Sequence, residues 1–567
     1  MSDEQSLKVV LCWHMHQPDY RGPDHGDYQL PWVYLHAVKD YSDMAAHLEG
    51  NPDARAVVNF APVLLEQLED YGQQISNWLE TGQLIRDPLL AALAGPGLPV
   101  DQKSRRELFH ACRKANEQNL IKRFSTFHRL TEIAGWVDKH AESSIYLSDQ
   151  YLADLLVWYH LAWMGEYSRT NDLRIRSLEK KRIDFNADDR RCLVQAIGEL
   201  ITGIIGRYRK LAEENRIELS VTPYAHPIVP LLLDLHSVRE AMPDAALPDA
   251  PSYPGGEPRA RWHIRNGIKT FERYFGLRPV GCWPSEGAVS GETLRLLEEE
   301  GFRWAASGQQ VLHNSLAAFS GGAAIPEHWI HQPYRLGEGK LQCFFRDDGL
   351  SDLIGFTYAD WHADDAVENL VQHLETIADT TDGQANRVVS IIMDGENAWE
   401  YYPRNGCFYL TSLYKRLAEN PRLELTTFSD VLSKQKSAPQ SLTGMVAGSW
   451  VYGTFSTWIG DPDKNRAWEM LVEAKQTFDR IIESGRLDDK AKTEAELQLA
   501  RCEGSDWFWW FGDYNPGETV SDFERLFRMQ LTYLYELLAE EPPEYLTKVF
   551  AQGTGDPAKG GVMRQNV

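Results

Sequence analysis

The feature that most constrains the fold of this 567-residue chain is a series of short, continuously apolar segments, each followed by polar residues. Such runs are typical of parallel strands that are covered on both faces, whereas half-exposed strands alternate apolar and polar residues. Helical patterns separate several of the runs, and this repetition predicts an α/β barrel. An eighth segment, at 423–428, has a weaker pattern. The clear segments are 7–13, 55–61, 217–222, 279–283, 302–307, 341–345 and 388–393.

Long stretches without strand signals divide the chain. Residues 62–216 are rich in helical patterns and too long for a plain connection, which predicts a helical insertion in a barrel domain that spans 1–435. A polar linker at 434–444 precedes residues 445–545, which have helical periodicity and are expected to form a C-terminal bundle completing the cleft. The remaining segments are predicted as loops (243–262 and 308–340) and as a disordered tail (546–567).

Composition argues against several classes of partner. The net charge of −24 opposes binding to nucleic acids or to an anionic membrane, but it is neutral toward an uncharged ligand. The seven cysteines are scattered and form no C-x-x-C pair, which is typical of a reducing compartment without a disulfide framework or zinc ribbon. No signal peptide is visible, and no segment approaches the roughly 20 apolar residues of a membrane span. We therefore expect a soluble, cytoplasmic protein.

Two acids follow predicted strands. Glu286 closes the segment GCWPSE, and Asp394 follows the run VVSIIM. Parallel α/β barrels place their catalytic groups at these strand ends, and glycoside hydrolysis needs two carboxylic acids. Each acid also has an ordinary structural interpretation, as a first-turn Glu or an N-cap Asp. A further acid, Glu396, lies two residues beyond Asp394, but direct contact with the strand end favours Asp394.

Three histidines form a second group of candidates. His14 and His16 alternate along a strand end in WHMHQPDY, so both imidazoles face the same side. His226 lies between two prolines just after the segment 217–222. Imidazoles in this position can bind a metal or hydrogen-bond the hydroxyls of a sugar, and they can also be satisfied structural residues.

The remaining candidates combine charge with aromatic rings. Arg346 precedes a group of acids that includes Asp352, and these residues either hold sugar hydroxyls or form a buried ion network, which we favour. The segments 448–469 and 504–515 are dense in tryptophan. Exposed aromatic faces suit sugar rings, but most of these side chains are expected in the core, with one or two at the cleft.

Together these segments resemble glycoside hydrolase family 57. The resemblance rests on HMHQPDY, LPWVYLHAVKDY, VTPYAHPIVPLL, GCWPSEG, RDDGLSDLIGF, MDGENAWEYY and GSDWFWW, which follow one another in the order of the family. It implies an incomplete (β/α)7 barrel with a helical domain behind it. It also implies α-glucan or maltooligosaccharide substrates, as in starch and glycogen, and a retaining mechanism with no metal or other cofactor.

The resemblance assigns roles residue by residue. Glu286 matches the family's nucleophile and Asp394 its general acid/base. His14, His16 and His226 match residues of the subsite next to the cleaved bond. The other candidates for substrate binding are Trp283, Arg346, Asp352, Trp450, Trp458, Asp506 and Trp507.

Within the family, the HQP triplet looks like that of α-amylases, amylopullulanases and glucanotransferases, whereas branching enzymes tend to depart from it. The WPSEG and LSDLIGF segments look closer to the α-amylase and amylopullulanase group. This predicts hydrolysis of α-1,4 bonds, with α-1,6 bonds as further candidates. One alternative is a 4-α-glucanotransferase or branching enzyme that uses the same glycosyl-enzyme intermediate. A second is a metal-dependent deacetylase or mannosidase-like enzyme with the three histidines and Asp394 as ligands, and a third is a non-catalytic glucan-binding protein.

Overall fold

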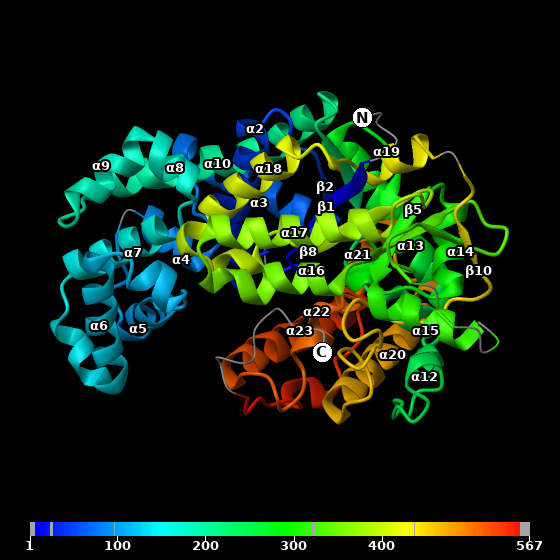
Figure 1. Cartoon of the computed structure of the whole chain (residues 1–567). Coiled ribbons are helices and arrows are strands. Elements are labelled where there is room, and N and C mark those ends of the chain that lie inside the picture. Colours follow the sequence, from blue (N-terminus) through cyan, green and yellow to red (C-terminus); the bar gives the residue numbers. More distant parts are fainter. Residues whose placement is uncertain are drawn as a thin grey trace.

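The centre of the molecule is a barrel of seven parallel strands surrounded by helices (Figure 1), which confirms the predicted fold class. The residues described by the computed structural model are 6–22, 26–95, 97–319, 321, 324–325, 327–435 and 437–555. The barrel strands are β1 (Leu7–Met15), β2 (Ala56–Phe60), β3 (Ile217–Val221), β4 (Gly281–Cys282), β5 (Trp304–Gly308), β7 (Gln342–Arg346) and β8 (Val388–Asp394).

The strands follow the order β7-β5-β4-β3-β2-β1-β8, and the ring closes where Arg346 of β7 pairs with Ser390 of β8. Strand β1 has the longest pairing, from Lys8 beside Val388 of β8 onward. This register sets His14 of β1 directly beside Asp394 of β8. Two sequence-distant candidates are therefore neighbours at the carboxyl edge of the barrel, because parallel strands end at the same edge.

Three short strands pair outside this ring. Strand β9 (Leu423–Leu425), in the weak eighth segment, pairs with Leu7–Val9 of β1, whereas β2 pairs with β1 only from Cys12 onward. Strand β6 (Tyr334–Leu336) runs antiparallel to β7, and β10 (Gln440–Leu442) pairs with β6. The eighth segment is thus a strand that extends the sheet without entering the barrel.

Two loop predictions were wrong. Residues 308–340 contain helix α15 (Gln309–Phe319) as well as β6, and helix α13 (Gly256–Phe275) begins inside the segment 243–262. Helix α15 starts directly after β5, so no turn residues mark its beginning. Helix α13 starts after Gly255, whose positive φ of 62° bends the chain into the helix.

Helices fill the segment 62–216 between β2 and β3 (Figure 1). Its two long members, α3 and α10, pack against each other, and a capping box of Asn186 and Asp189 starts α10. The helical elements are α3 (Pro62–Thr81), α4 (Pro88–Ala94), α5 (Gln102–Ala111), η2 (Glu117–Ile121), α6 (Ser125–Lys139), η3 (Ala141–Tyr146), α7 (Asp149–Trp163), α8 (Glu166–Asn171), α9 (Leu173–Lys181) and α10 (Ala187–Glu213).

Further helices surround the barrel between its other strands. No helix in the described part of the chain is both long and apolar enough to cross a membrane. In chain order these helices are α1 (Trp32–His36), α2 (Ser42–Gly50), α11 (Val229–Leu233), α12 (Val238–Ala241), α13, α14 (Gly291–Glu299), α15, α16 (Asp348–Asp352), α17 (Ala363–Thr380), α18 (Cys407–Glu419) and α19 (Phe428–Ser433).

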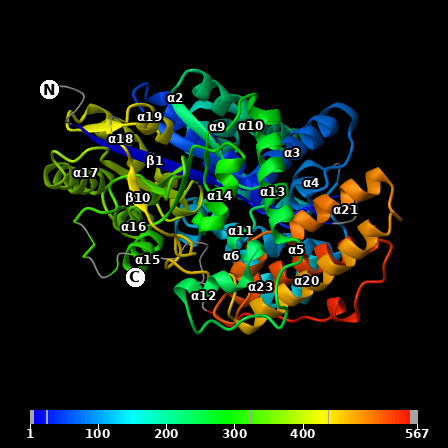
Figure 2. The ribbon, with the colours of Figure 1, turned by 90° about the vertical axis from the view of Figure 1, so that its right-hand side faces the viewer.

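After a stretch of turns, the chain is largely helical from Pro462 to Leu537, and Figure 2 shows these orange and red helices side by side next to the barrel. Of the tail predicted to be disordered, Leu546 and Ala551 are buried and Thr554 N donates to Asp513 O, whereas 556–567 lie outside the described residues. The helices are α20 (Pro462–Glu483), α21 (Asp489–Cys502), α22 (Asp506–Trp510) and α23 (Gly517–Leu537).

A buried carboxylate, Glu503, fixes these helices to the barrel. It follows α21 and pairs with Arg259 of α13 at 2.6 Å, while His263 Nε2 lies 2.7 Å from the same oxygen. Tyr253 Oη donates to the other oxygen at 2.5 Å. Burial raises the pKa of Glu503, but the Arg259 charge and the hydrogen bonds of His263 and Arg259 outweigh it and lower the pKa to about 2.

We expect Glu503→Gln to lower the free energy of unfolding by about 3–5 kcal/mol at pH 7, because it leaves Arg259 buried without its counter-ion. The carboxylate contribution is present above the unfolded-state pKa of about 4.3 and is lost as pH falls toward 2, so the difference between wild type and variant should shrink in acid. Urea unfolding at pH 7 and pH 3 measures both effects. The matched control is Glu540→Gln, which removes exposed ion pairs to Arg480 and Arg486 and should change stability little.

Candidate active site

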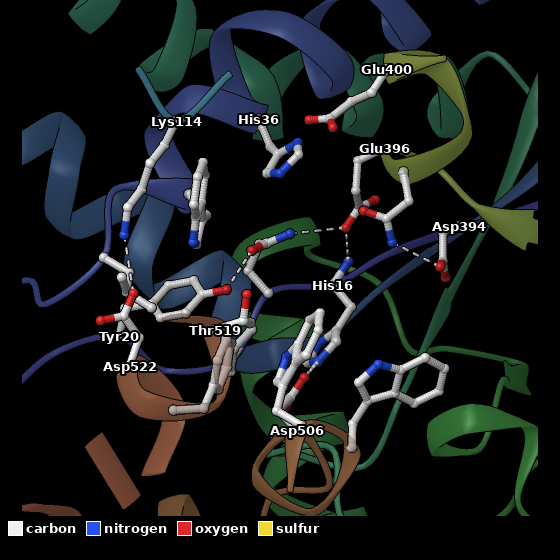
Figure 3. Close-up of a pocket in the computed structure, with 18 of the residues that line it drawn as sticks. His16, Tyr20, His36, Lys114, Asp394, Glu396, Glu400, Asp506, Thr519 and Asp522 are labelled. Carbon is white, nitrogen blue, oxygen red and sulfur yellow. Dashed lines mark hydrogen bonds and ion pairs between the residues drawn. The ribbon is translucent and has the colours of Figure 1, made fainter. Parts of the chain in front are cut away.

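A cavity of about 420 Å³ lies at the carboxyl edge of the barrel (Figure 3). The barrel, the segment 62–216 and the C-terminal helices all contribute to its wall. The candidates from the sequence that line it are His14, His16, Glu286, Asp394, Trp450 and Asp506. Lining residues that the sequence analysis did not select include Tyr20, Trp32, His36, Lys114, Trp163, Glu396, Glu400, Trp509, Trp510, Glu518 and Asp522.

Glu286 projects from a short turn after β4. Its φ of 57° and ψ of 25° are left-handed, an uncommon conformation for a residue with a side chain. The Trp450 indole donates to Glu286 Oε2 at 2.9 Å, and His226 Nδ1 lies 3.9 Å from Oε1. Backbone strain of this kind concentrates at functional sites, where the surrounding structure holds it in place.

Asp394 is the last residue of β8, and Asn397 Nδ2 donates to its Oδ2 at 2.9 Å. Burial raises the pKa of Asp394 to about 6, although the Asn397 hydrogen bond and the charges of His16 and Arg346 lower it in part. Gly395 lets the chain pass close to Met15, because a Cβ would lie 2.2 Å from the sulfur of that residue. Asp394 is therefore held where its proton can leave and return near neutral pH.

Glu396 is a second buried acid in the cavity wall, and it is 2% exposed. Its Oε1 accepts from the His16 backbone N–H, the Gln17 amide and the Tyr41 hydroxyl, each at 3.3 Å. Burial, with the neighbouring charge of Asp394, raises the pKa of Glu396 well above its usual range. Its Oε2 is buried and has no hydrogen-bond partner among the described residues.

Two of the three histidines belong to a buried hydrogen-bond chain. Asn59 of β2 holds His14 Nδ1 at 2.7 Å, His14 Nε2 lies 3.1 Å from His226 Nε2, and His226 Nδ1 lies 2.8 Å from Ser505 Oγ. Burial lowers the pKa of His14 to about 3 and that of His226 well below its usual value. Both rings are thus neutral at pH 7, and the bond to Asn59 Oδ1 places the proton of His14 on Nδ1. His226 then donates to His14 and accepts from Ser505.

His16 stands beside this chain. Its Nε2 lies 2.8 Å from Asp506 Oδ1, and its ring stacks on that of His226 with centroids 3.7 Å apart and an interplanar angle of 16°. In Figure 3 His16 and Asp506 point toward each other at the floor of the cavity. Asp506 comes from α22, so a C-terminal helix contributes directly to the site.

The same three histidines are the residues that could hold a metal ion. One ring nitrogen from each lies within 4.8 Å of the others. However, the His14–His226 hydrogen bond engages both Nε2 atoms, and a ring nitrogen that donates a proton has no lone pair for a metal. The stacked rings of His16 and His226 also keep their lone pairs in nearly parallel planes, whereas a tetrahedral ion needs ligands that converge.

Arg346 and Asp352 form an ion network behind the cavity wall. The Arg346 guanidinium pairs with Asp348 and Asp352, each at 2.6 Å, and donates from Nε to Ile392 O at 2.9 Å. It also lies 5.5 Å from the ring centroid of Trp450, the residue that donates to Glu286. Arg346 therefore supports the wall from behind and contributes positive charge near Asp394.

The other tryptophans that the sequence analysis selected, Trp283, Trp458 and Trp507, lie in the core. Trp283 is fully buried and packs edge-on against Trp450, with ring centroids 5.2 Å apart. Trp458 and Trp507 are 0% and 1% exposed, and the structure does not bring them to the cavity. Trp509 and Trp510 line it instead. The Trp-rich pattern predicts aromatic rings at the cleft, but it does not predict which ones.

A seven-stranded barrel with two acids opening onto one cavity is an arrangement found in barrel glycoside hydrolases. The family model described as "Glycosyl hydrolase family 57" matches residues 10–443. The chain therefore belongs to this family of glycoside hydrolases. Among curated proteins, none matches the sequence.

Several solved structures share the fold. A GH57 branching enzyme from Thermococcus kodakaraensis superposes with a TM-score of 0.58 at 16% identity, covering 94% of this chain and 90% of that one. A GH57-type branching enzyme from Pyrococcus horikoshii superposes with a TM-score of 0.56 at 15% identity, covering 99% of this chain and 99% of that one. The α-amylase AmyC from Thermotoga maritima superposes with a TM-score of 0.52 at 13% identity, covering 94% of this chain and 97% of that one.

We expect Asn397→Ala to raise the pKa of Asp394 by about one unit, because a hydrogen bond that stabilises the charged carboxylate is lost. A carboxyl ¹³C NMR titration of Asp394 measures the change directly. The control is Asn386→Ala, which removes hydrogen bonds to Ser437 at the surface and should leave the titration as it is. An unchanged or lower pKa in Asn397→Ala would contradict this account of the site.

Proposed function

We propose that the protein is a retaining glycoside hydrolase that cleaves α-1,4 bonds of α-glucans or maltooligosaccharides, with α-1,6 bonds as further candidates. The observation that carries the proposal is the different setting of two acids in one cavity. Glu286 receives a hydrogen bond from Trp450, whereas burial raises the pKa of Asp394 to about 6. A buried carboxyl group whose pKa is raised toward neutrality, in the same cavity as a second carboxyl group, is typical of a general acid/base that works beside a nucleophile.

In the proposed reaction Glu286 attacks the anomeric carbon while protonated Asp394 gives its proton to the departing glycosidic oxygen. The leaving sugar departs with that proton, and Glu286 is bound covalently to the remaining glycosyl unit. Asp394, now a carboxylate, takes a proton from water, and the resulting hydroxide equivalent displaces Glu286. Two inversions restore the original configuration at the anomeric carbon.

The surrounding residues suit the binding of an uncharged sugar. His16, Asp506 and Glu396 offer polar atoms to hydroxyl groups, and Trp450, Trp509 and Trp510 offer rings for sugar faces. The neutral His14–His226 pair fixes the position of His226 next to Glu286. The names of the structural relatives, branching enzymes and an α-amylase, also point to α-glucans.

Hydrolysis and transfer differ in the group that accepts the glycosyl unit from Glu286. The WPSEG and LSDLIGF segments favour water as the acceptor, as in the α-amylase and amylopullulanase group. We also propose a cytoplasmic location, since all seven cysteines are free. The acidic surface is unsuited to nucleic acids or anionic lipid.

We expect Glu286→Gln and Asp394→Asn each to reduce cleavage of maltoheptaose on the order of 10³-fold or more, because each removes a group that reacts. Reducing-end counts with product sizing measure the rate and separate the acceptors: free reducing ends rise in hydrolysis and stay constant in transfer. Glu544→Gln, an exposed carboxylate outside the cavity, is the control. Near-wild-type activity in either site variant would refute the roles proposed for these acids.

The pH dependence provides a separate test. Asp394 must be protonated in the first step, so kcat/KM should fall as pH rises through about 6 and above. Asn397→Ala should move this alkaline limb to higher pH, in step with the NMR titration. A limb that stays in place in the variant would assign the general acid to another group.

Chelation tests the metal-dependent alternative. Because the ring nitrogens of His14 and His226 are engaged with each other and with Asn59 and Ser505, and His16 Nε2 is engaged with Asp506, we expect EDTA to leave the rate on maltoheptaose unchanged. The measurement compares the treated enzyme before and after addition of Zn²⁺. Loss of activity with EDTA and its return with Zn²⁺ would support a metal-dependent enzyme instead.

A further inference from the structure

One end of the cavity wall is made by two segments that are far apart in the sequence. Lys114 follows α5 in the segment 62–216, and Glu518 and Asp522 lie in the first turns of α23. All three line the cavity. In Figure 3 Lys114, Tyr20 and Asp522 lie at the side of the cavity opposite Asp394, and His16 lies between the two sides.

Ion pairs join these two segments. Lys114 Nζ lies 2.5 Å from Glu518 Oε1 and 3.2 Å from Asp522 Oδ2, and His110 Nε2 lies 2.8 Å from the same Glu518 oxygen. We call His110, Lys114, Glu518 and Asp522 the clasp. Burial lowers the pKa of Lys114, but the bonds to Glu518 and Asp522 raise it above its usual value, so the amine stays charged.

The size of the cavity determines how the clasp would affect the binding of a polymer. A volume of about 420 Å³ is near the lower end of the range of about 300–1,000 Å³ that is typical of small-molecule sites. Such a space holds a short stretch of sugar units. A longer glucan bound at Glu286 and Asp394 has to leave the cavity at some point, and the clasp joins the two walls at the end away from Asp394.

We propose that the clasp is the end wall of the glucan site and makes the protein act on short α-glucans and chain ends in preference to bonds inside long chains. This inference rests on the proposed function. The clasp side chains are partly exposed, at 27% for Lys114, 55% for Glu518 and 28% for Asp522. Ion pairs with this exposure add little stability, so the wall can be opened without unfolding the protein.

The test compares two substrates in Lys114→Met, which keeps an unbranched side chain one atom shorter and removes its charge. Maltoheptaose offers chain ends, whereas dyed, cross-linked amylose releases colour mainly by internal cleavage. We expect the ratio of the rate on cross-linked amylose to that on maltoheptaose to rise on the order of five-fold, as the loss of an ion pair shifts the wall toward its open state. The melting temperature should change little.

Two further variants are controls for this comparison. Lys114→Arg retains the charge and should keep the wild-type ratio, and Lys548→Met, which breaks an exposed pair with Glu544 outside the cavity, should do the same. An unchanged ratio in Lys114→Met, or a wild type that cleaves cross-linked amylose as readily as maltoheptaose, would overturn the role of the clasp alone. No activity of the wild type on any glucan would overturn the proposed function together with this inference.

Discussion

The site depends first on the buried ion pair between Glu503 and Arg259. This pair fixes the end of α21 against α13 of the barrel, and the chain turns into α22 immediately afterward. Ser505 and Asp506 follow within three residues, and they hold His226 and His16 through hydrogen bonds of 2.8 Å. The C-terminal helices thus contribute directly to the candidate site, because Ser505 and Asp506 are hydrogen-bond partners of two of its three histidines.

The electrostatics of the cavity follow from burial. Burial raises the pKa of both acids at the end of β8, Asp394 and Glu396, and the charge of Asp394 raises that of Glu396 further. Arg346 moderates this effect for Asp394, while the neutral rings of His14 and His226 add polar atoms without charge. Asp394 is therefore able to exchange its proton near neutral pH, while the two neutral histidines add no further charge to the site.

The sequence predicts the barrel well, because a strand that is buried on both faces must be continuously apolar. It also predicts Glu286 and Asp394, whose places at strand ends follow from chain order alone. It does not predict Asn59, a polar residue within the apolar run of β2, or Ser505, because their roles depend on which strands and helices become neighbours. Tryptophan composition likewise indicates an aromatic cleft, yet Trp458 and Trp507 enter the core while Trp509 and Trp510 reach the cavity.

The strained turn at Glu286 is held in place jointly by the barrel and by the loop that carries Trp450. A left-handed conformation costs a residue with a Cβ about 1–2 kcal/mol, so something must hold it. Gly287 N donates to Pro284 O, Trp450 N donates to Glu286 O at 3.1 Å, and Val289 and Gly448 exchange both backbone hydrogen bonds. Each such bond contributes about 0.5–1.5 kcal/mol, so together they offset the strain. The loop that carries Trp450 approaches this closely because Gly308 has no Cβ, which would lie 2.6 Å from the Cα of Trp450. The direction of the Glu286 carboxylate is therefore set by backbone packing from two distant segments.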